Sequence, residues 1–243
     1  MFDYSDKAIQ SSFLHDVFSA VPPHYDLINQ LITWGLDKQW RRRAARECLA
    51  SQPRRVLDLC CGTGDLAVTL ARLADNNAEV AGVDYSQPML EIAAQKTKRV
   101  GDRSKLSFVC GDIATIPFSD AYFDCIGISF AFRNLTYKNP LAGRYIAEVL
   151  RVLNTGGRFV IVETSQPKSR LIKKLYHLYL RYFVFRLGLL ISGNREAYRY
   201  LAESAANYYA PEELKKLLMK AGFRQVSFRR LLLGAVSIHI AVK

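Results

Sequence analysis

Short apolar runs alternate with longer segments of helical spacing through the middle of the chain. Five of these runs predict strands, because each is short, rich in apolar residues and bounded by polar or turn-forming residues. They lie at residues 56–60, 80–84, 106–110, 123–130 and 158–162. Strands that alternate with helices favour a parallel sheet with helices on both faces, so the pattern predicts an α/β fold.

Helix signals fall between the expected strands. Residues 65–74 and 139–153 have helical spacing, and the glycine pair at residues 156–157 is expected to stop the second of these helices. Ser86 is expected to cap a further helix, with Pro88 in its first turn, since a hydroxyl can accept from the free backbone amides there.

The pattern changes beyond residue 207. Pro211 and the two glutamates after it predict the start of a helix, because carboxylates favour the positive end of the helix dipole. Apolar runs at 226–232 and 235–242, separated by a short turn near Gly234, then predict an antiparallel hairpin. A mostly parallel seven-stranded sheet that ends in such a hairpin is typical of the Rossmann-like fold of S-adenosylmethionine-dependent methyltransferases, whereas a dehydrogenase sheet usually stays parallel.

One domain is expected to span residues 1–243, because the length and the half-apolar composition suit a single core. We expect four parts within it. They are an N-terminal helical cover at 1–50, broken by Pro22-Pro23, a cofactor-binding core at 51–167, a basic aromatic helical insertion at 168–207 that serves as a lid, and a final helix with the hairpin at 208–243.

Charge adds a candidate partner. The chain has 34 basic and 22 acidic residues, a net charge of +12, which favours a membrane surface, nucleic acid or an acidic substrate as partner and also aids solubility. In the insertion, Leu, Tyr and Phe residues recur at helical spacing between positions 171 and 183, interleaved with Lys173, Lys174, Arg181 and Arg186. This pattern is typical of a helix on an anionic lipid surface, and equally of an amphipathic lid packed on the domain. Both interpretations hold together if the lid forms a mouth that faces lipid.

Cysteine usage and the N-terminal residues predict a cytoplasmic protein, with peripheral contact at the inner face of the cell membrane. The five cysteines are odd in number and no pair has zinc-ligand spacing, so neither disulfides nor a metal site is expected. The first residues lack the apolar stretch of a signal peptide, and no stretch reaches the roughly 18 apolar residues of a membrane span.

The strongest candidate chemistry lies at residues 56–65. Gly62 and Gly64 follow a predicted strand, where glycine lets the backbone turn tightly and lets a ligand approach closely. The glycines alone are ambiguous, since residues 62–67 also fit the dinucleotide pattern G-x-G-x-x-A. Asp58 shifts the balance, because a carboxylate at this strand end is expected to order the loop around the cationic amino-acid part of S-adenosylmethionine, and an anionic pyrophosphate gains nothing from it.

Two further acids follow the next two strands. Asp84 is expected to accept hydrogen bonds from ribose hydroxyls, and Asp112 to meet the adenine amino group. Together with Asp58 they stand at three consecutive strand ends, on the edge where α/β folds bind ligands. The alternative is that Asp58 and Asp84 only cap helices or turns. The set favours S-adenosylmethionine as the cofactor.

Further motifs extend over nearly the whole chain. They include Tyr25-Asp26-Leu27-Ile28-Asn29, Trp40-Arg41, Gly111-Asp112, Arg133-Asn134, Tyr198-Arg199-Tyr200-Leu201 and Ala221-Gly222-Phe223. With the cofactor loop, these motifs resemble the demethylmenaquinone/ubiquinone C-methyltransferase family, and the Arg133-Asn134 segment and the tail block are the more specific ones. The resemblance implies cofactor contacts at Thr63, Asp84, Asp112, Ile113 and Ser129.

The resemblance also implies methyl transfer to a ring carbon of a polyprenyl quinol. Demethylmenaquinol is preferred over a benzoquinol of the ubiquinone pathway by resemblance alone. A carbon acceptor needs extra electron density, which a quinol supplies when it loses a phenolic proton. Arg133 is expected to stabilise the phenolate and Asn134 to orient a hydroxyl; the alternative is that the pair anchors its loop. Tyr25 and Asp26 lie in the segment that covers the site in the family, with a helix-start contact as the alternative.

Two aromatic residues depart from the family pattern. The chain has Ala131-Phe132 where the family has Gly-Leu, and Tyr208-Tyr209 where the family has a ring residue followed by proline. Phe132 and Tyr209 are expected to enlarge the aromatic wall near the substrate. Four scattered histidines leave the general base unidentified.

Other function classes stay open. The charge suggests a nucleic-acid methyltransferase, but the chain lacks the Pro-Cys pair of pyrimidine C5 chemistry and the Asn-Pro-Pro-Tyr or Asp-Pro-Pro-Tyr segment of base amino methylation, so nucleic acid is not the expected partner. A non-catalytic cofactor-binding module and a nicotinamide dehydrogenase are further alternatives. The sequence does not show the oligomeric state, and a homodimer is one open arrangement.

Overall fold

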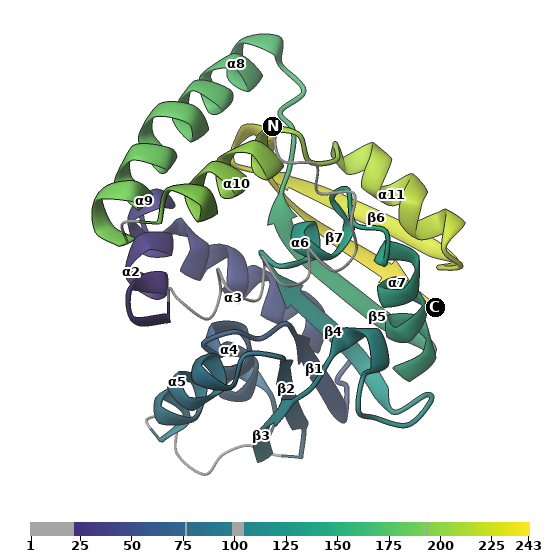
Figure 1. The fold of residues 1–243 in the computed structure, drawn as a ribbon. Helices are drawn as coiled ribbons and strands as arrows, with labels where there is room; N and C mark the ends of the chain where they lie inside the picture. Colours follow the sequence, from purple (N-terminus) through teal and green to yellow (C-terminus); the bar gives the residue numbers. More distant parts are fainter. Residues whose placement is uncertain (1–21, 76, 99–104, 193) are drawn as a thin grey trace.

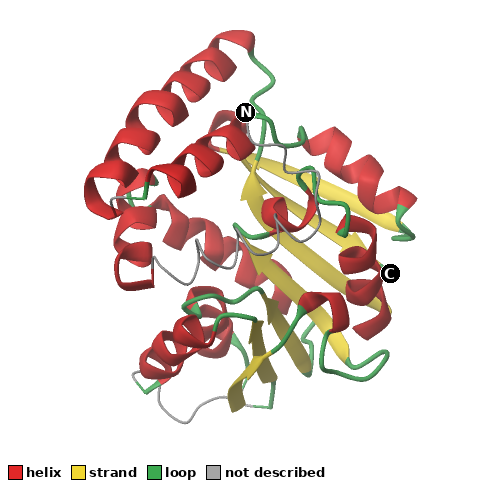
Figure 2. Cartoon of the chain, in the orientation of Figure 1, coloured by secondary structure: helices red, strands yellow, loops and turns green. Residues whose placement is uncertain are grey.

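One seven-stranded sheet organises the chain (Figures 1 and 2). The computed structural model describes residues 22–75, 77–98, 105–192 and 194–243. The strand order is β3-β2-β1-β4-β5-β7-β6, and β7 runs antiparallel to both neighbours while the other pairs are parallel. The predicted Rossmann-like sheet with a terminal hairpin is therefore confirmed. The strands are β1 Arg55–Leu59, β2 Glu79–Asp84, β3 Lys105–Cys110, β4 Phe123–Ser129, β5 Leu153–Thr164, β6 Gln225–Leu231 and β7 Val236–Val242.

Helices cover both faces of this sheet. On one face α3 (Leu36–Leu49) and α4 (Asp65–Leu73) bury small and aliphatic side chains against it. On the other face α7 (Ala142–Val152) and α11 (Pro211–Lys220) do the same. The short helix α6 (Phe132–Thr136) follows β4 beyond the end of this strand.

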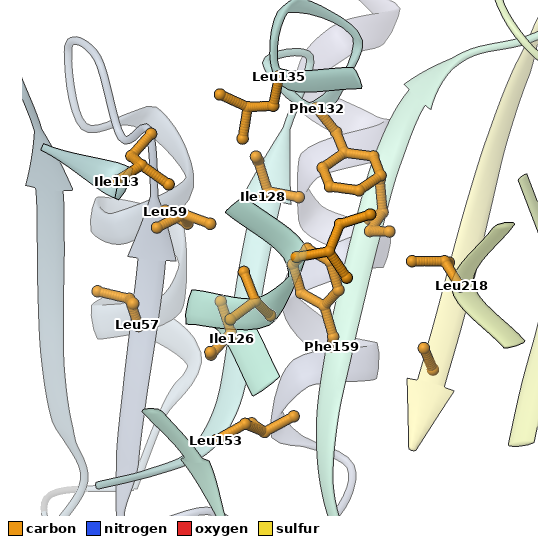
Figure 3. Close-up of a cluster of buried hydrophobic side chains, with 14 of the residues drawn as sticks. Leu57, Leu59, Ile113, Ile126, Ile128, Phe132, Leu135, Leu153, Phe159 and Leu218 are labelled. Carbon is orange, nitrogen blue, oxygen red and sulfur yellow. The ribbon is translucent and has the colours of Figure 1, made fainter. Parts of the chain in front are cut away.

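Side chains that alternate along β1 separate the two halves of the core. Leu57 and Leu59 join the cluster on the α7 side, which Figure 3 shows, whereas Val56 joins the cluster on the α3 and α4 side. Successive side chains of a strand point to opposite faces of the sheet. Asp58 has the parity of Val56 and therefore lies on the α4 side, where it is 1% exposed. This parity decides which backbone groups its carboxylate can reach.

The insertion is helical, as expected, and packs on the N-terminal helix α2 (Pro22–Ile32). Ile28 of α2 contacts Ala197 and Tyr198 of the insertion. Together they form a layer beyond the carboxyl ends of the strands (Figure 1). The insertion comprises α8 (Arg170–Leu178), the π-helical segment η2 (Tyr179–Val184), α9 (Phe185–Ser192) and α10 (Arg195–Ala206).

No helix within the described ranges is long and apolar enough to cross a membrane. The first 21 residues of the expected N-terminal cover lie outside the described residues.

The expected helix stop at the glycine pair is wrong. Helix α7 ends at Val152 and β5 begins at Leu153, so residues 156–157 lie inside β5. Backbone hydrogen bonds hold this strand end: the Gly156 amide donates to the Lys243 carbonyl, and the Lys243 amide donates to the Gly157 carbonyl, both at 3.1 Å. Pairing with a distant segment thus overrides the local glycine signal.

The expected cap at Ser86 is wrong in its chemistry. Ser86 stands at the cap position of α5 (Gln87–Thr97), but its hydroxyl has no hydrogen-bond partner among the described residues. Its amide instead donates to Oδ1 of Asp84 at 2.9 Å. The carboxylate at the end of β2 therefore fixes the start of α5 in place of the hydroxyl.

Candidate functional site

The turn after β1 uses the left-handed region of backbone conformation. Cys60, Gly62 and Gly64 have φ angles of 52°, 51° and 79°. A Cβ at Gly64 would lie 2.8 Å from the Cβ of Ala93 on α5, so close helix packing requires glycine there. A Cβ at Gly62 would meet nothing within 4 Å. The backbone at Gly62 therefore faces open space into which a ligand can fit.

Two buried carboxylates hold this loop. Oδ2 of Asp58 accepts the amide of Ala67 in α4 at 2.8 Å, and Oδ2 of Asp84 accepts the amide of Gly62 at 2.8 Å. Burial raises the pKa of Asp58 well above its usual range and also raises the pKa of Asp84. These contacts with backbone amides are the ones expected if the two acids cap a helix and a turn. They also order the loop. Each carboxylate oxygen of Asp84 keeps a lone pair with which to accept from a ligand.

The other predicted cofactor residues lie along the same sheet edge. Asp112 caps the short helix η1 (Ile113–Thr115), where its Oδ1 accepts the amide of Ala114 at 2.8 Å, and the residue stays exposed. Ser129 ends β4, and its hydroxyl accepts a hydrogen bond from Nε of Arg41 at 3.1 Å. Strands β1 to β4 are parallel neighbours, so their carboxyl ends bring these residues to one edge.

Asp26 of α2 lies over the cofactor loop. Its Oδ1 accepts the hydroxyl of Thr63 at 2.7 Å, and its Oδ2 pairs with Nζ of Lys96 in α5 at 2.6 Å. Lys96 also pairs with Asp65 at 2.6 Å and donates to the Thr63 hydroxyl at 2.9 Å. A polar network thus joins α2 to the loop and to α5. The side chain of Tyr25 lies outside the described residues.

A cavity of about 530 Å³ lies next to this edge. It is enclosed by α2, α3, the insertion, the ends of β4 and β5, and the short turn η3 (Leu232–Gly234) between β6 and β7. Most of its lining side chains are apolar or aromatic. The aromatic ones are Trp34, Trp40, Phe130, Tyr176, Tyr179, Tyr198 and Tyr200.

Arg133 and Asn134 both line this cavity. Arg133 Nη1 donates to Oε1 of Glu163 at 3.3 Å and to the hydroxyl of Thr164 at 3.1 Å. Its Nε has no partner among the described residues, nor has Oδ1 of Asn134, although both atoms are buried. Buried polar atoms are normally hydrogen-bonded. Beside the cavity the pair therefore holds one buried donor and one buried acceptor that no described residue uses.

The predicted aromatic wall of Phe132 and Tyr209 does not form. Phe132 is fully buried in the core, with its ring centroid 5.5 Å from that of Phe159, and neither Phe132 nor Tyr209 lines the cavity. Consecutive helical residues point about 100° apart, so Phe132 turns under α6 while Arg133 and Asn134 face the cavity. The aromatic wall comes instead from α3, α8, η2 and α10, together with the loop residues Trp34 and Phe130.

No histidine whose side chain the structure describes lines the cavity. His239 is fully buried in β7, where its Nε2 donates to the Pro211 carbonyl at 3.0 Å. Burial lowers the pKa of His239 to about 4, so it is neutral and structural near pH 7. His177 lies 3.1 Å from the amide oxygen of Gln166. The described residues also contain no cluster of three or more metal-ligating side chains.

Comparison with known proteins decides the family. Residues 6–243 match the model of the ubiE/COQ5 methyltransferase family. The chain belongs to this family. It is 42% identical over 224 residues to the demethylmenaquinone methyltransferase of Thermus thermophilus, covering 92% of this chain and 98% of that one. It is 34% identical to the ubiquinone/menaquinone biosynthesis C-methyltransferase UbiE of Pseudomonas putida, covering 100% of this chain and 94% of the relative.

Solved methyltransferases share the fold of this family member. A SAM-dependent methyltransferase of Thermotoga maritima superposes with a TM-score of 0.60 at 20% identity, covering 94% of this chain and 99% of that one. A SAM-dependent methyltransferase of Aquifex aeolicus superposes with a TM-score of 0.54 at 17% identity, covering 82% and 88%.

The loop of this family member fits S-adenosylmethionine better than a dinucleotide. The open backbone at Gly62 lies among the carboxylates of Asp26, Asp65 and Asp84. These acids suit a cationic amino-acid group, and they would repel a pyrophosphate. Lys96 is neutralised by two of them.

The sequence pattern missed two residues that connect the cavity to the loop. Asp37 lines the cavity, where its Oδ1 accepts the hydroxyl of Thr33 at 2.9 Å and its Oδ2 pairs with Arg41. Arg41 continues to Ser129 and lies 3.6 Å from Asp65. Asp37 and Arg41 lie four residues apart on a helix, which is common on solvated helices, and the Trp40-Arg41 motif gave Arg41 no role.

Proposed function

We propose that this chain transfers a methyl group from S-adenosylmethionine to a ring carbon of a polyprenyl quinol, with demethylmenaquinol as the preferred acceptor. The observation that carries the proposal is the apolar cavity beside the cofactor loop, in which Arg133 and Asn134 supply buried polar atoms without partners. An apolar cavity with few polar groups suits an apolar ring bearing hydroxyls. The names of the relatives in Thermus and Pseudomonas support a quinone acceptor.

The donor is held along the strand ends. Asp84 accepts the ribose hydroxyls, Asp112 meets the adenine amino group beside Ile113, and Ser129 closes the pocket at the end of β4. Gly62, Thr63 and Gly64 leave room for the amino-acid part of S-adenosylmethionine. Asp58 fixes the conformation of the loop through its hydrogen bond to the amide of Ala67. S-adenosylmethionine supplies an electrophilic methyl group. The protein has to align the ring carbon with this group and exclude water.

The acceptor is oriented by Arg133 and Asn134. The quinol oxygen that loses its proton accepts from Nε of Arg133, and the other hydroxyl donates to Oδ1 of Asn134. When the phenolic proton leaves, negative charge develops on this oxygen and on the ring carbon, and the Arg133 guanidinium stabilises it. Attack of the ring carbon on the methyl group would release S-adenosylhomocysteine, and the ring carbon would then lose its proton to water, which restores aromaticity.

We assign the carboxylate of Asp37 as the base that accepts the phenolic proton. It is the one carboxylate among the described lining residues of the cavity. A base must reach the phenolic proton directly or through one water, and no described histidine is placed to do so.

Asp26, with Tyr25 on the same helix, covers the donor. The contacts of Asp26 with Thr63 and Lys96 support this role over direct contact with the quinol.

The reaction takes place at the inner face of the cell membrane, because a polyprenyl quinol stays in lipid. The basic insertion supports contact with anionic lipid, since residues 168–200 carry eight basic side chains and one acidic one, Glu196.

The test is methyl transfer from labelled S-adenosylmethionine to reduced demethylmenaquinone and to a demethylated benzoquinol, with donor binding measured separately. Arg133→Lys keeps a charge opposite Glu163 but removes the Nε donor, and is expected to lower turnover about 100-fold. Asp37→Asn is expected to lower it by a similar factor with donor binding intact. Arg43→Lys, exposed on α3, is the matched control. Donor binding without product on either ring would refute the quinol assignment.

A further inference from the structure

The most exposed residues that line the cavity are all apolar. Of all its lining residues, four are exposed: Trp34 (76%), Leu175 (57%), Leu232 (51%) and Leu233 (73%). The polar lining residues, which include Arg133 and Asp37, are buried or half-buried. A cavity that took its substrate from water would be expected to present polar groups at its mouth. Large exposed apolar patches instead mark contact with an apolar partner.

Two of these four residues lie in a strained turn. Leu232 and Leu233 form η3 between β6 and β7, with φ angles of 43° and 54°. Hairpin turns that need this conformation strongly favour Gly, Asn and Asp, because a branched side chain strains the backbone there. The turn therefore has two leucines at positions where Gly, Asn or Asp would cause less backbone strain. Strain of this kind is retained where the side chain has a function.

Helix α8 continues the apolar surface from Leu175. Leu171, Leu175 and Leu178 are exposed and follow the i, i+4, i+7 spacing of one helix stripe. Ile172 and Tyr176, on the adjoining side, line the cavity. The stripe therefore faces outward beside the mouth, and α8 forms an outer edge of the molecule (Figure 1).

Basic side chains flank this stripe. Arg170, Lys173 and Lys174 are exposed, and none of them has an ion-pair partner among the described residues. Apolar side chains bordered by free cations complement an anionic lipid surface, where the apolar groups enter the acyl boundary and the cations meet phosphates. A protein partner of neutral charge would gain nothing from these cations.

We propose that the η3 leucines and the α8 leucine stripe dock together into the headgroup region of an anionic bilayer, with Trp34 at the same rim. The cavity then opens directly into lipid, and the quinol ring reaches Arg133 without crossing water while its prenyl tail stays in the membrane. This extends the proposed function by naming the surface and the lipid charge. If the surface docks in this way, its loss should lower activity on quinol in a membrane and leave activity on water-soluble quinol unchanged.

The first experiment uses a reporter that the chain already contains. Trp34 and Trp40 are its two tryptophans, and only Trp34 is exposed. Vesicles of phosphatidylglycerol and phosphatidylcholine are expected to shift Trp34 emission to the blue, and brominated lipid is expected to quench it. Vesicles of phosphatidylcholine alone are expected to bind far more weakly. Binding without quenching would mean docking through another face and would overturn the proposal, as would the absence of binding.

Variants then identify the surface. Lys173→Gln with Lys174→Gln is expected to weaken vesicle binding on the order of twentyfold, at about fivefold for each lysine. Leu232→Asn with Leu233→Asn relieves the left-handed strain, so this variant keeps its fold while losing most vesicle binding. Leu73→Asn with Met219→Asn is the matched control, since both residues are exposed and apolar but lie on α4 and α11. Equal vesicle binding by the leucine and control variants would overturn the proposal.

Activity separates this proposal from the proposed function. Leu171→Gln with Leu178→Gln removes two stripe residues that do not line the cavity. It is expected to keep full activity on a short-chain, water-soluble quinol and to lose it on long-chain quinol in vesicles. Activity lost or kept on both substrates alike would refute docking. No activity of the unmodified chain on either quinol, with vesicle binding intact, would refute the quinol assignment alone. Concentration-dependent dimers without lipid, abolished by this variant, would show that the surface binds a second copy.

Discussion

Glu163 is a carboxylate with no exposed surface beside the candidate active site. Its oxygens accept from the amides of Arg133 and Thr164, from the Arg133 guanidinium and from the Thr164 hydroxyl. A buried charge is tolerated only with such a complete set of partners. Glu163 therefore fixes the Arg133 guanidinium through Nη1, while Nε keeps no partner among the described residues.

Removing Glu163 alone should be costly. Glu163→Gln leaves the Arg133 charge buried without a counter-ion, and the free energy of unfolding is expected to fall by about 3–5 kcal/mol. Adding Arg133→Gln removes the unpaired charge and should recover much of the loss. Denaturant unfolding of both variants measures this difference. Equal stabilities of the single and double variants would show that the pair is not coupled.

Protonation of His239 makes the free energy of unfolding depend on pH. Its pKa is lowered by burial to about 4, against about 6.5 in an unfolded chain. Between these pH values the unfolded chain binds more protons, so the free energy of unfolding falls as the pH drops from 6.5 to 4, by up to about 3 kcal/mol. His239→Gln keeps a donor for the Pro211 carbonyl and should remove this part of the pH profile. Parallel profiles of the two proteins in denaturant unfolding would contradict the assignment.

At the residue scale, the positions of the acids could be predicted from the sequence, whereas their contact with S-adenosylmethionine stays a prediction. The acids at strand ends were predictable, because strand parity and the carboxyl edge place Asp58 and Asp84 at the loop. The direction of each residue in α6 was not, because a five-residue helix gives no periodicity from which to tell that Phe132 is buried and Arg133 faces the cavity. Asp37 was missed because it comes to the site only when α3 packs beside β4.

At the scale of elements, helix α2 is fastened to the cofactor loop by side chains alone. Asp26 contributes both contacts, one to Thr63 and one to Lys96. The Asp26–Lys96 pair is partly exposed, so it stabilises the closed position by about 1 kcal/mol or less. The polar contact of α2 with the loop is therefore weak, whereas the packing of Ile28 on the insertion holds the other side of the helix.

Loosening this contact should show in α2. Asp26→Asn is expected to speed amide hydrogen exchange of residues 22–32 by about two- to fivefold, because the pair contributes at most about 1 kcal/mol. Glu91→Gln, an exposed change on α5, is the control and should leave α2 unchanged. Hydrogen exchange followed by mass spectrometry measures both. Unchanged exchange in Asp26→Asn would mean that packing alone holds the cover.

The predicted boundaries of elements were wrong where long-range strand pairing decides them. The start of β5 at Leu153 has no apolar alternation to announce it, and only its contact with Lys243 holds the glycine pair in the strand. Strands β1, β2 and β4 were predictable, because each is a short and mostly apolar segment that is largely buried on both faces of the sheet.

At the scale of the whole molecule, the cavity could not be predicted from the sequence. Its walls come from α2 and α3, the ends of β4 and β5, the insertion and η3, which are separated by up to 200 residues of chain. In the sequence of each of these elements, the lining residues look like ordinary core or surface residues. The hairpin prediction placed a turn near Gly234, but nothing in the pattern indicated that the leucines before it would lie at the mouth of a site.

The position of β7 has a consequence for synthesis. This strand lies between β5 and β6, although both precede it in the chain. While the ribosome is still adding residues 236–242, the finished half of the sheet ends in the bare backbone of β5, and β6 has no neighbour to pair with. Unpaired strand edges of this kind invite association between nascent chains. Nascent chains are therefore most prone to associate after β5 has formed and before β7 is inserted, and factors that shield emerging chains would matter most in this interval.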